Sequence, residues 1–149
     1  MAIGLQEVVT YRMTSPEREG RVLASGLRPE ANSYVRIANP IAPERSVLRQ
    51  SLLASVLEVV EKNAKAESIA MFEVGSIFEP NKNDLPNEPR KLAIAMTGAR
   101  IASAWDVKDS PAFDFYDMKG RIDPPFCFYF VPIALRYTKR VYSLNVLPR

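Results

Sequence analysis

The chain of 149 residues contains no histidine and a single cysteine, Cys127. Without an imidazole, no Ser-His-Asp or Cys-His arrangement can form, and the usual His and Cys ligands of a zinc site are missing. A lone cysteine cannot form an internal disulfide. We interpret Cys127 as a small core hydrophobe, with a reactive thiol activated by a nearby Lys or Arg as the alternative.

The six glycines do not form the GxxxxGK[ST] or GxGxxG patterns that cradle phosphate groups. No apolar run approaches the ~20 residues of a membrane span. The N-terminal residues MAIGLQEV lack the charged and apolar regions of a secretory signal. These absences predict no catalytic residues, no cofactor-binding residues and no metal site in this chain, no membrane contact, and a cytoplasmic location.

The net charge of +3 comes from the end of the chain. Residues 1–123 hold 16 Lys and Arg against 17 Asp and Glu, whereas residues 124–149 hold four basic residues and no acid. The basic character therefore gives little support for nucleic-acid binding by residues 1–123. One alternative function remains for the C-terminal segment, an RNA-binding module in which its basic residues and aromatics contact the strand. Those aromatics are Phe126, Phe128, Tyr129, Tyr137 and Tyr142.

The run from Asn39 to Asn63 organises the rest of the chain. Pro40 and Pro43 hold its first part extended, and Pro43 also suits a first helical turn. From Glu44 onward no helix breaker occurs for about twenty residues, which predicts a helix roughly 30 Å long. Its wide apolar stripe would pack on the chain's own sheet, on a partner, or on both. The interface candidates are Pro43, Leu48, Arg49, Leu52, Leu53, Val56, Leu57 and Val60.

The remaining pattern predicts an α+β fold, a mainly antiparallel sheet flanked by helices. A short helix is expected at about 16–24, capped by Thr14, and residues 80–89 are expected to form an exposed loop. Gly75 marks a bulge or a turn. An ordinary strand pair, 126–131 and 133–137 around Pro132, is the simpler interpretation of the C-terminal segment. Strands are predicted at 4–13, 33–38, 68–74, 76–79 and 91–98.

Two groups of charged residues have both a structural and a chemical interpretation. Glu73 lies in a strand that looks buried, so it needs a cation such as Arg49 or Arg36, or a raised pKa. We expect a structural ion pair for Glu73. Arg45 and Arg49 are four apart and could hold a phosphate, although pairing with acids is the expected role. The group Asp106, Asp109, Asp114 and Asp117 could gather Mg²⁺, but a solvated loop is the simpler interpretation.

Four blocks resemble the β subunit of bacterial phenylalanyl-tRNA synthetase, in its catalytic-like core region. They are GLQEVVTYRMTSPE at 4–17, VRIANPIAPERSVLRQSLLASVLEVVEKN at 35–63, MFEVGSIFEP at 71–80 and FDFYDMKG at 113–120. Their order and spacing also fit, so the resemblance extends over residues 4–122. Residues 1–122 are accordingly assigned to an incomplete core-like domain, and 123–149 to a divergent basic and aromatic segment.

The resemblance implies a degenerate class II synthetase core that scaffolds the enzyme without catalysing aminoacylation. It also implies that the helix containing Pro43 packs against the catalytic α subunit and a second β subunit, with tRNA engaged indirectly. ATP and Mg²⁺ would belong to the whole enzyme, since this chain lacks the family's catalytic Arg motifs. Asp123-Pro124-Pro125 stands where the family continues with a helix. The sheet would then keep an exposed edge, which predicts self-association of the isolated chain.

Overall fold

The computed structural model describes residues 4–23, 33–82, 84–101, 104–107, 110–122, 131–135 and 141–145. For the last two segments the description is of the backbone. Among the described residues, no helix is long and apolar enough to cross a membrane. The elements are β1 (Gln6–Glu7), β2 (Met13–Thr14), α1 (Pro16–Gly20), η2 (Pro43–Arg45), β3 (Val47–Leu48), α2 (Leu53–Lys62), β4 (Ser68–Ser76), β5 (Arg90–Gly98), α3 (Phe115–Ile122), β6 (Val131–Leu135) and β7 (Val141–Asn145).

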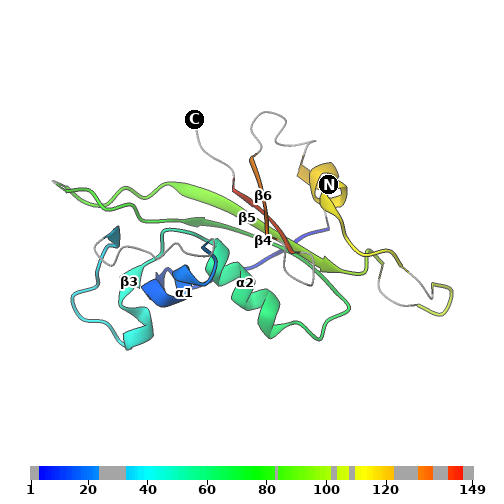
Figure 1. Cartoon of the computed structure of the whole chain (residues 1–149), viewed down its shortest axis with the longest axis horizontal. Helices are drawn as coiled ribbons and strands as arrows, with labels where there is room; N and C mark the ends of the chain where they lie inside the picture. The colour runs from blue at the N-terminus through cyan, green and yellow to red at the C-terminus, as the bar shows by residue number, and fades with distance from the viewer. Residues whose placement is uncertain are drawn as a thin grey trace.

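A five-stranded sheet in the order β1-β4-β5-β7-β6 forms the centre of the fold (Figure 1). β1 runs parallel to β4, and the other neighbouring pairs are antiparallel. β4 and β5 pair along their whole lengths, from Ser68 opposite Gly98 to Ser76 opposite Arg90. A second sheet contains β2 and β3. The α+β class is therefore confirmed, with a mixed sheet that is mainly antiparallel.

Alternate side chains of β4 and β5 pack into two separate clusters, as the period of two in a strand requires. On one face, Ile69 and Met71 pack with Val56 of α2. On the other face, Ile94 and Met96 pack with Phe113 and with Met118 of α3. Figure 1 accordingly shows α2 and α3 on opposite sides of the sheet.

The predicted helix of about twenty residues is wrong. η2, β3 and α2 occupy its place, and α2 has ten residues, about 15 Å. Backbone pairing accounts for the difference: the Leu48 N–H donates to the Val35 carbonyl and the Arg49 N–H to the Arg12 carbonyl. Groups engaged in this way with other segments cannot form the bonds of a helix. α2 starts where the Ser51 hydroxyl accepts a hydrogen bond from the Leu53 N–H (3.1 Å).

Several other expectations are corrected. The predicted strand at 4–13 is reduced to β1 and β2, and the one at 33–38 to a single bridge between Arg36 and Val47. The predicted strand at 76–79 is reduced to the last residue of β4 and a bridge between Glu79 and Asn87. Ser15, not Thr14, caps α1 by accepting from the Arg18 N–H (3.4 Å). Gly75 pairs regularly inside β4, so it marks neither a bulge nor a turn. Pro132 lies inside β6 and not between two strands, and β6 is an edge strand where proline is tolerated. Most of the predicted strand 126–131 lies outside the described residues.

Candidate functional site

Arg49 and Glu73 form an ion pair in the interior. Arg49 Nη1 lies 2.7 Å from Glu73 Oε1, and each side chain is 2% exposed. Thr10 completes the cluster, because its hydroxyl donates to Glu73 Oε2 (2.7 Å) and accepts from Arg49 Nη1 (2.8 Å). Arg49 Nε donates to the Ser76 carbonyl (3.0 Å). Buried charges persist only when they are paired and hydrogen-bonded, and this pair meets both conditions.

The Arg49 main chain joins the same region. Its N–H donates to the Arg12 carbonyl (3.0 Å), and its carbonyl accepts from the Phe78 N–H (2.9 Å). One residue thus ties the segment after β1, the loop before α2 and the end of β4 together. This arrangement uses Arg49 and Glu73 for structure, and neither charged group faces solvent. The phosphate-binding alternative for Arg49 has no support in this geometry.

The interface candidates fall into three groups by exposure. Leu52, Val56 and Val60 lie in the chain's own core, against β4 and β5. Leu53 is buried as well, whereas Leu48 and Leu57 are half-buried and Pro43 is exposed. Only the last three present surface that a partner can reach without opening the core. Arg45, beside Pro43, is stacked on the Tyr11 ring, with its guanidinium carbon 3.8 Å from the ring centre.

A second buried carboxylate, Glu19 of α1, was not singled out by the sequence. Its Oε2 accepts from the Gln50 N–H (3.3 Å), and Oε1 has no hydrogen-bond partner among the described residues. Burial raises the pKa of Glu19 from 4.5 to about 7, against the lowering effect of its hydrogen bonds and of Arg49. Burial, and then Glu19, also raise the pKa of Tyr34. A glutamate in a short helix beside Gly20 gives no sequence signal of this burial.

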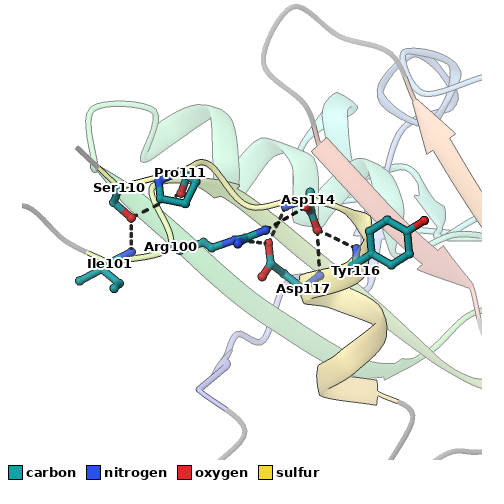
Figure 2. Close-up of polar contacts among 7 residues, drawn as sticks. All are labelled: Arg100, Ile101, Ser110, Pro111, Asp114, Tyr116 and Asp117. Carbon is teal, nitrogen blue, oxygen red and sulfur yellow. Dashed lines mark hydrogen bonds and ion pairs between the residues drawn. The ribbon is translucent and has the colours of Figure 1, made fainter.

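Asp114 and Asp117 form the start of α3 (Figure 2). Asp114 Oδ1 accepts from the Tyr116 N–H (2.8 Å) and the Asp117 N–H (3.1 Å), and Asp117 Oδ2 accepts from the Asp114 N–H (2.7 Å). This reciprocal arrangement is a capping box. Arg100 pairs with both carboxylates at 2.8 Å. Burial raises the pKa of Asp117, but the Asp114 N–H and Arg100 together outweigh it, so the pKa lies below its ordinary value.

The two aspartates are therefore engaged by backbone N–H groups and a guanidinium, which does not favour the magnesium alternative. Asp106 is exposed, and Asp109 lies outside the described residues. Among residues that the structure describes, no group of three or more His, Cys, Asp and Glu could hold a metal ion. Cys127 also lies outside them, as do most aromatics of the RNA-binding alternative.

Several large apolar side chains are exposed. In the region around α3, the exposed fractions are 58% for Ile101, 93% for Trp105 and 76% for Tyr116. Elsewhere, Val9 is 88% exposed and Ile41 87%. Apolar side chains exposed singly are common on soluble proteins, so these exposures do not by themselves mark a binding site.

Comparison with known proteins gives consistent results. Residues 1–127 match the family model of the phenylalanyl tRNA synthetase beta chain CLM domain. The chain is 38% identical over 126 residues to the phenylalanine--tRNA ligase beta subunit of Syntrophus aciditrophicus (strain SB), and 37% identical over 123 residues to that of Bacillus thuringiensis subsp. konkukian (strain 97-27). These matches cover 83% and 80% of this chain. The chain spans about 15% of the length of either relative.

Among solved structures, pyrrolysyl-tRNA synthetase from Desulfitobacterium hafniense superposes with a TM-score of 0.61 and 11% sequence identity. The superposition covers 95% of this chain and 60% of that one. At this identity the likeness shows a shared fold, that of a class II synthetase, and nothing about the reaction.

Proposed function

The chain belongs to the phenylalanyl-tRNA synthetase beta chain family, and we propose that it serves there as a non-catalytic core that scaffolds the catalytic α subunit. The family match over residues 1–127 carries this proposal. Its role in tRNA aminoacylation would be to hold the α subunit, a second β subunit and, indirectly, the tRNA in one assembly. Such an assembly would be cytoplasmic, with ATP and Mg²⁺ handled by the α subunit.

The polar residues support a scaffold, because they are used within the fold. Glu73 of β4 is neutralised by Arg49 in the interior. Asp114 accepts from two backbone N–H groups in the first turn of α3, and Asp117 accepts from the Asp114 N–H. We therefore propose that this is a degenerate class II core, in which a substrate-binding strand has become a structural one.

The sheet edges support a role in association. β1 and β6 are the outer strands of the five-stranded sheet. An outer strand presents unpaired backbone N–H and C=O groups that can form hydrogen bonds with a strand of another chain. We propose that the isolated chain self-associates and that partner subunits cover these edges in the assembly. The reachable candidates Pro43, Leu48 and Leu57 would contribute to that contact.

Co-expression with the α subunit of a phenylalanine–tRNA ligase tests the proposal. We expect the tagged chain to retain the α subunit through size-exclusion chromatography. We expect no phenylalanine-dependent ATP–pyrophosphate exchange from the chain alone. Failure of the α subunit to co-purify, with the chain folded by circular dichroism, would contradict the scaffold function. Exchange activity of the chain alone would contradict its non-catalytic character.

A further inference from the structure

The short helix α1 is held in place by polar contacts. Glu19 is its buried residue, and no residue of α1 is among the described members of the two apolar clusters. Glu19 Oε2 accepts from the Gln50 N–H (3.3 Å), and Arg18 forms an ion pair with Glu58 of α2 (2.7 Å). α1 accordingly lies beside α2 in Figure 1. Among the described contacts, the position of the helix therefore depends on a buried carboxyl group and a partly exposed ion pair.

The surroundings of the Glu19 carboxyl suit its protonated form better than its charged form. Glu19 is 4% exposed, and its Oε1 has no hydrogen-bond partner among the described residues. Arg49 attracts the charged form, but the Arg49 guanidinium is already engaged with Glu73 at 2.7 Å. Tyr34 is buried on the other side of the contact, and burial, and then Glu19, raise its pKa. An ionised carboxylate with one buried oxygen unpaired costs free energy that the protonated group avoids.

Protonation of Glu19 is therefore coupled to the docking of α1. Burial raises the pKa of Glu19 from 4.5 to about 7, although the Gln50 and Ser51 N–H groups, and then Arg49, lower it. In an undocked helix the carboxyl would be in water and would have its ordinary pKa. The docked helix then binds the proton more tightly than the undocked one. Docking is favoured most below about pH 4.5 and is progressively weakened as the pH rises toward 7.

We propose that α1 is a pH-dependent element of this fold, which stays docked while Glu19 carries a proton and undocks locally when Glu19 loses it. The undocking is local because α1 supplies no side chain to the apolar clusters, so α2 and the sheet keep their packing without it. The ion pair between Arg18 and Glu58 is a second hold on the helix and sets how often it opens. Undocking is a property of this chain alone and does not depend on the proposed scaffold function.

Native-state hydrogen exchange of the whole chain, followed by NMR, tests the undocking. The reporting amides are Val22, whose N–H donates to the Glu19 carbonyl (3.3 Å), and Gln50, whose N–H donates to the Glu19 side chain. After correction for intrinsic exchange rates, we expect their opening equilibrium to increase about tenfold from pH 6 to pH 8, the factor given by pKa values of about 7 and 4.5. Glu19→Gln should make the opening at the two pH values equal within about twofold.

Glu17→Gln is the matched control, because Glu17 is an exposed glutamate of the same helix. Its own N–H, and then the Ser15 hydroxyl, lower the pKa of Glu17, so this carboxyl is ionised at both pH values. We expect Glu17→Gln to keep the increase of about tenfold. Glu58→Gln removes the ion pair with Arg18, so it should raise the opening at both pH values and leave their ratio unchanged.

Dependence on urea separates local undocking from unfolding of the whole chain. We expect the Val22 and Gln50 amides to exchange faster than those of the β4–β5 pair and with little dependence on low urea concentrations. Equal protection and equal urea dependence in both regions would mean that α1 opens only with the whole fold, which overturns the proposal. An unchanged pH ratio in Glu19→Gln would also overturn it. The carboxyl carbon-13 signal of Glu19 in the unmodified chain gives a check without any substitution, and a titration midpoint near 4.5 would contradict the coupling.

Discussion

The guanidinium of Arg49 crosses β4 at Gly75 and occupies the space that a β-carbon at position 75 would need. From there it reaches Glu73 at 2.7 Å and the Ser76 carbonyl at 3.0 Å. The backbone at position 75 pairs regularly with Lys91, so its conformation does not call for glycine. The requirement comes from the close approach of Arg49, which leaves no room for a β-carbon. Glu73 and Ser76 thus supply acceptors for the Arg49 side chain, and Gly75 leaves the space that this side chain occupies.

Gly75→Ala is expected to destabilise the fold by about 3 kcal/mol or more, because the methyl group would displace Arg49 from its buried partner. Urea unfolding followed by circular dichroism measures the change. Gly120→Ala in α3 is the control, since an added β-carbon there meets no atom within 4 Å. Relief of a mid-helix glycine should stabilise that variant by roughly 0.5–1 kcal/mol. Equal stability of Gly75→Ala and the unmodified chain would show that Arg49 has another route to Glu73.

Separate and joint removal of the buried charges should give different costs. Arg49→Met or Glu73→Leu alone leaves one unpaired charge in the interior and is expected to cost about 3–5 kcal/mol. The double variant Arg49→Met/Glu73→Leu leaves none, so its cost should be clearly smaller than the sum of the two single costs. A double-mutant cycle from urea unfolding gives the coupling energy. Strict additivity would mean that the ion pair contributes nothing beyond the separate residues.

Sequence alone located the central hairpin and the family. Strands close to β4 and β5 were predicted because β-branched and apolar residues run between clear turn signals, and the four matched blocks gave a family that the comparisons confirm. A cation was expected for Glu73 because a charge in an apolar strand needs one, and Arg49 was one of two candidates. Local sequence was sufficient for these predictions, because the apolar strand and the charged Glu73 within it lie within a few residues of each other.

Prediction failed where distant segments decide the outcome. The apolar spacing Leu48, Leu52, Val56 fits one helix. Leu48 nevertheless belongs to β3, because β3 pairs with β2 and the Leu48 N–H donates to the Val35 carbonyl, and no local pattern shows these contacts. The interface candidates were selected on that helix and lie mostly in the core for the same reason. The pair Asp114 and Asp117 was noticed, but its pairing with Arg100 depends on the bridge between Ala99 and Ala112, which brings the end of β5 beside the start of α3.

The stability of the fold should fall as the pH rises through the range set by Glu19. Burial gives its carboxyl a native pKa of about 7, above the 4.5 of an ordinary glutamate, so the native state binds this proton more tightly. The contribution is fully present below about pH 4.5 and is lost as the pH rises toward 7, up to about 3 kcal/mol. Glu19→Gln should remove this slope and unfold at higher urea concentration at pH 8. Parallel pH profiles for Glu19→Gln and the unmodified chain would contradict the raised pKa.

The start of α3 should depend more on its cap than on its ion pairs. Asp114→Ala removes the acceptor for the Tyr116 and Asp117 N–H groups and is expected to cost about 1 kcal/mol. Arg100→Ala removes two pairs in which the Arg100 side chain is 38% exposed, and exposed pairs are worth about 0–1 kcal/mol in total. Asp106→Ala is the control, because Asp106 is exposed between β5 and α3, and it should stay within about 0.5 kcal/mol.

Urea unfolding ranks these three variants, and the expected order of cost is Asp114→Ala, then Arg100→Ala, then Asp106→Ala. High salt should reduce the cost of Arg100→Ala, because screening weakens exposed pairs, and leave most of the cost of Asp114→Ala, because a cap is a short-range hydrogen bond. If Arg100→Ala costs more than Asp114→Ala at both salt concentrations, the guanidinium and not the capping box fixes the start of α3.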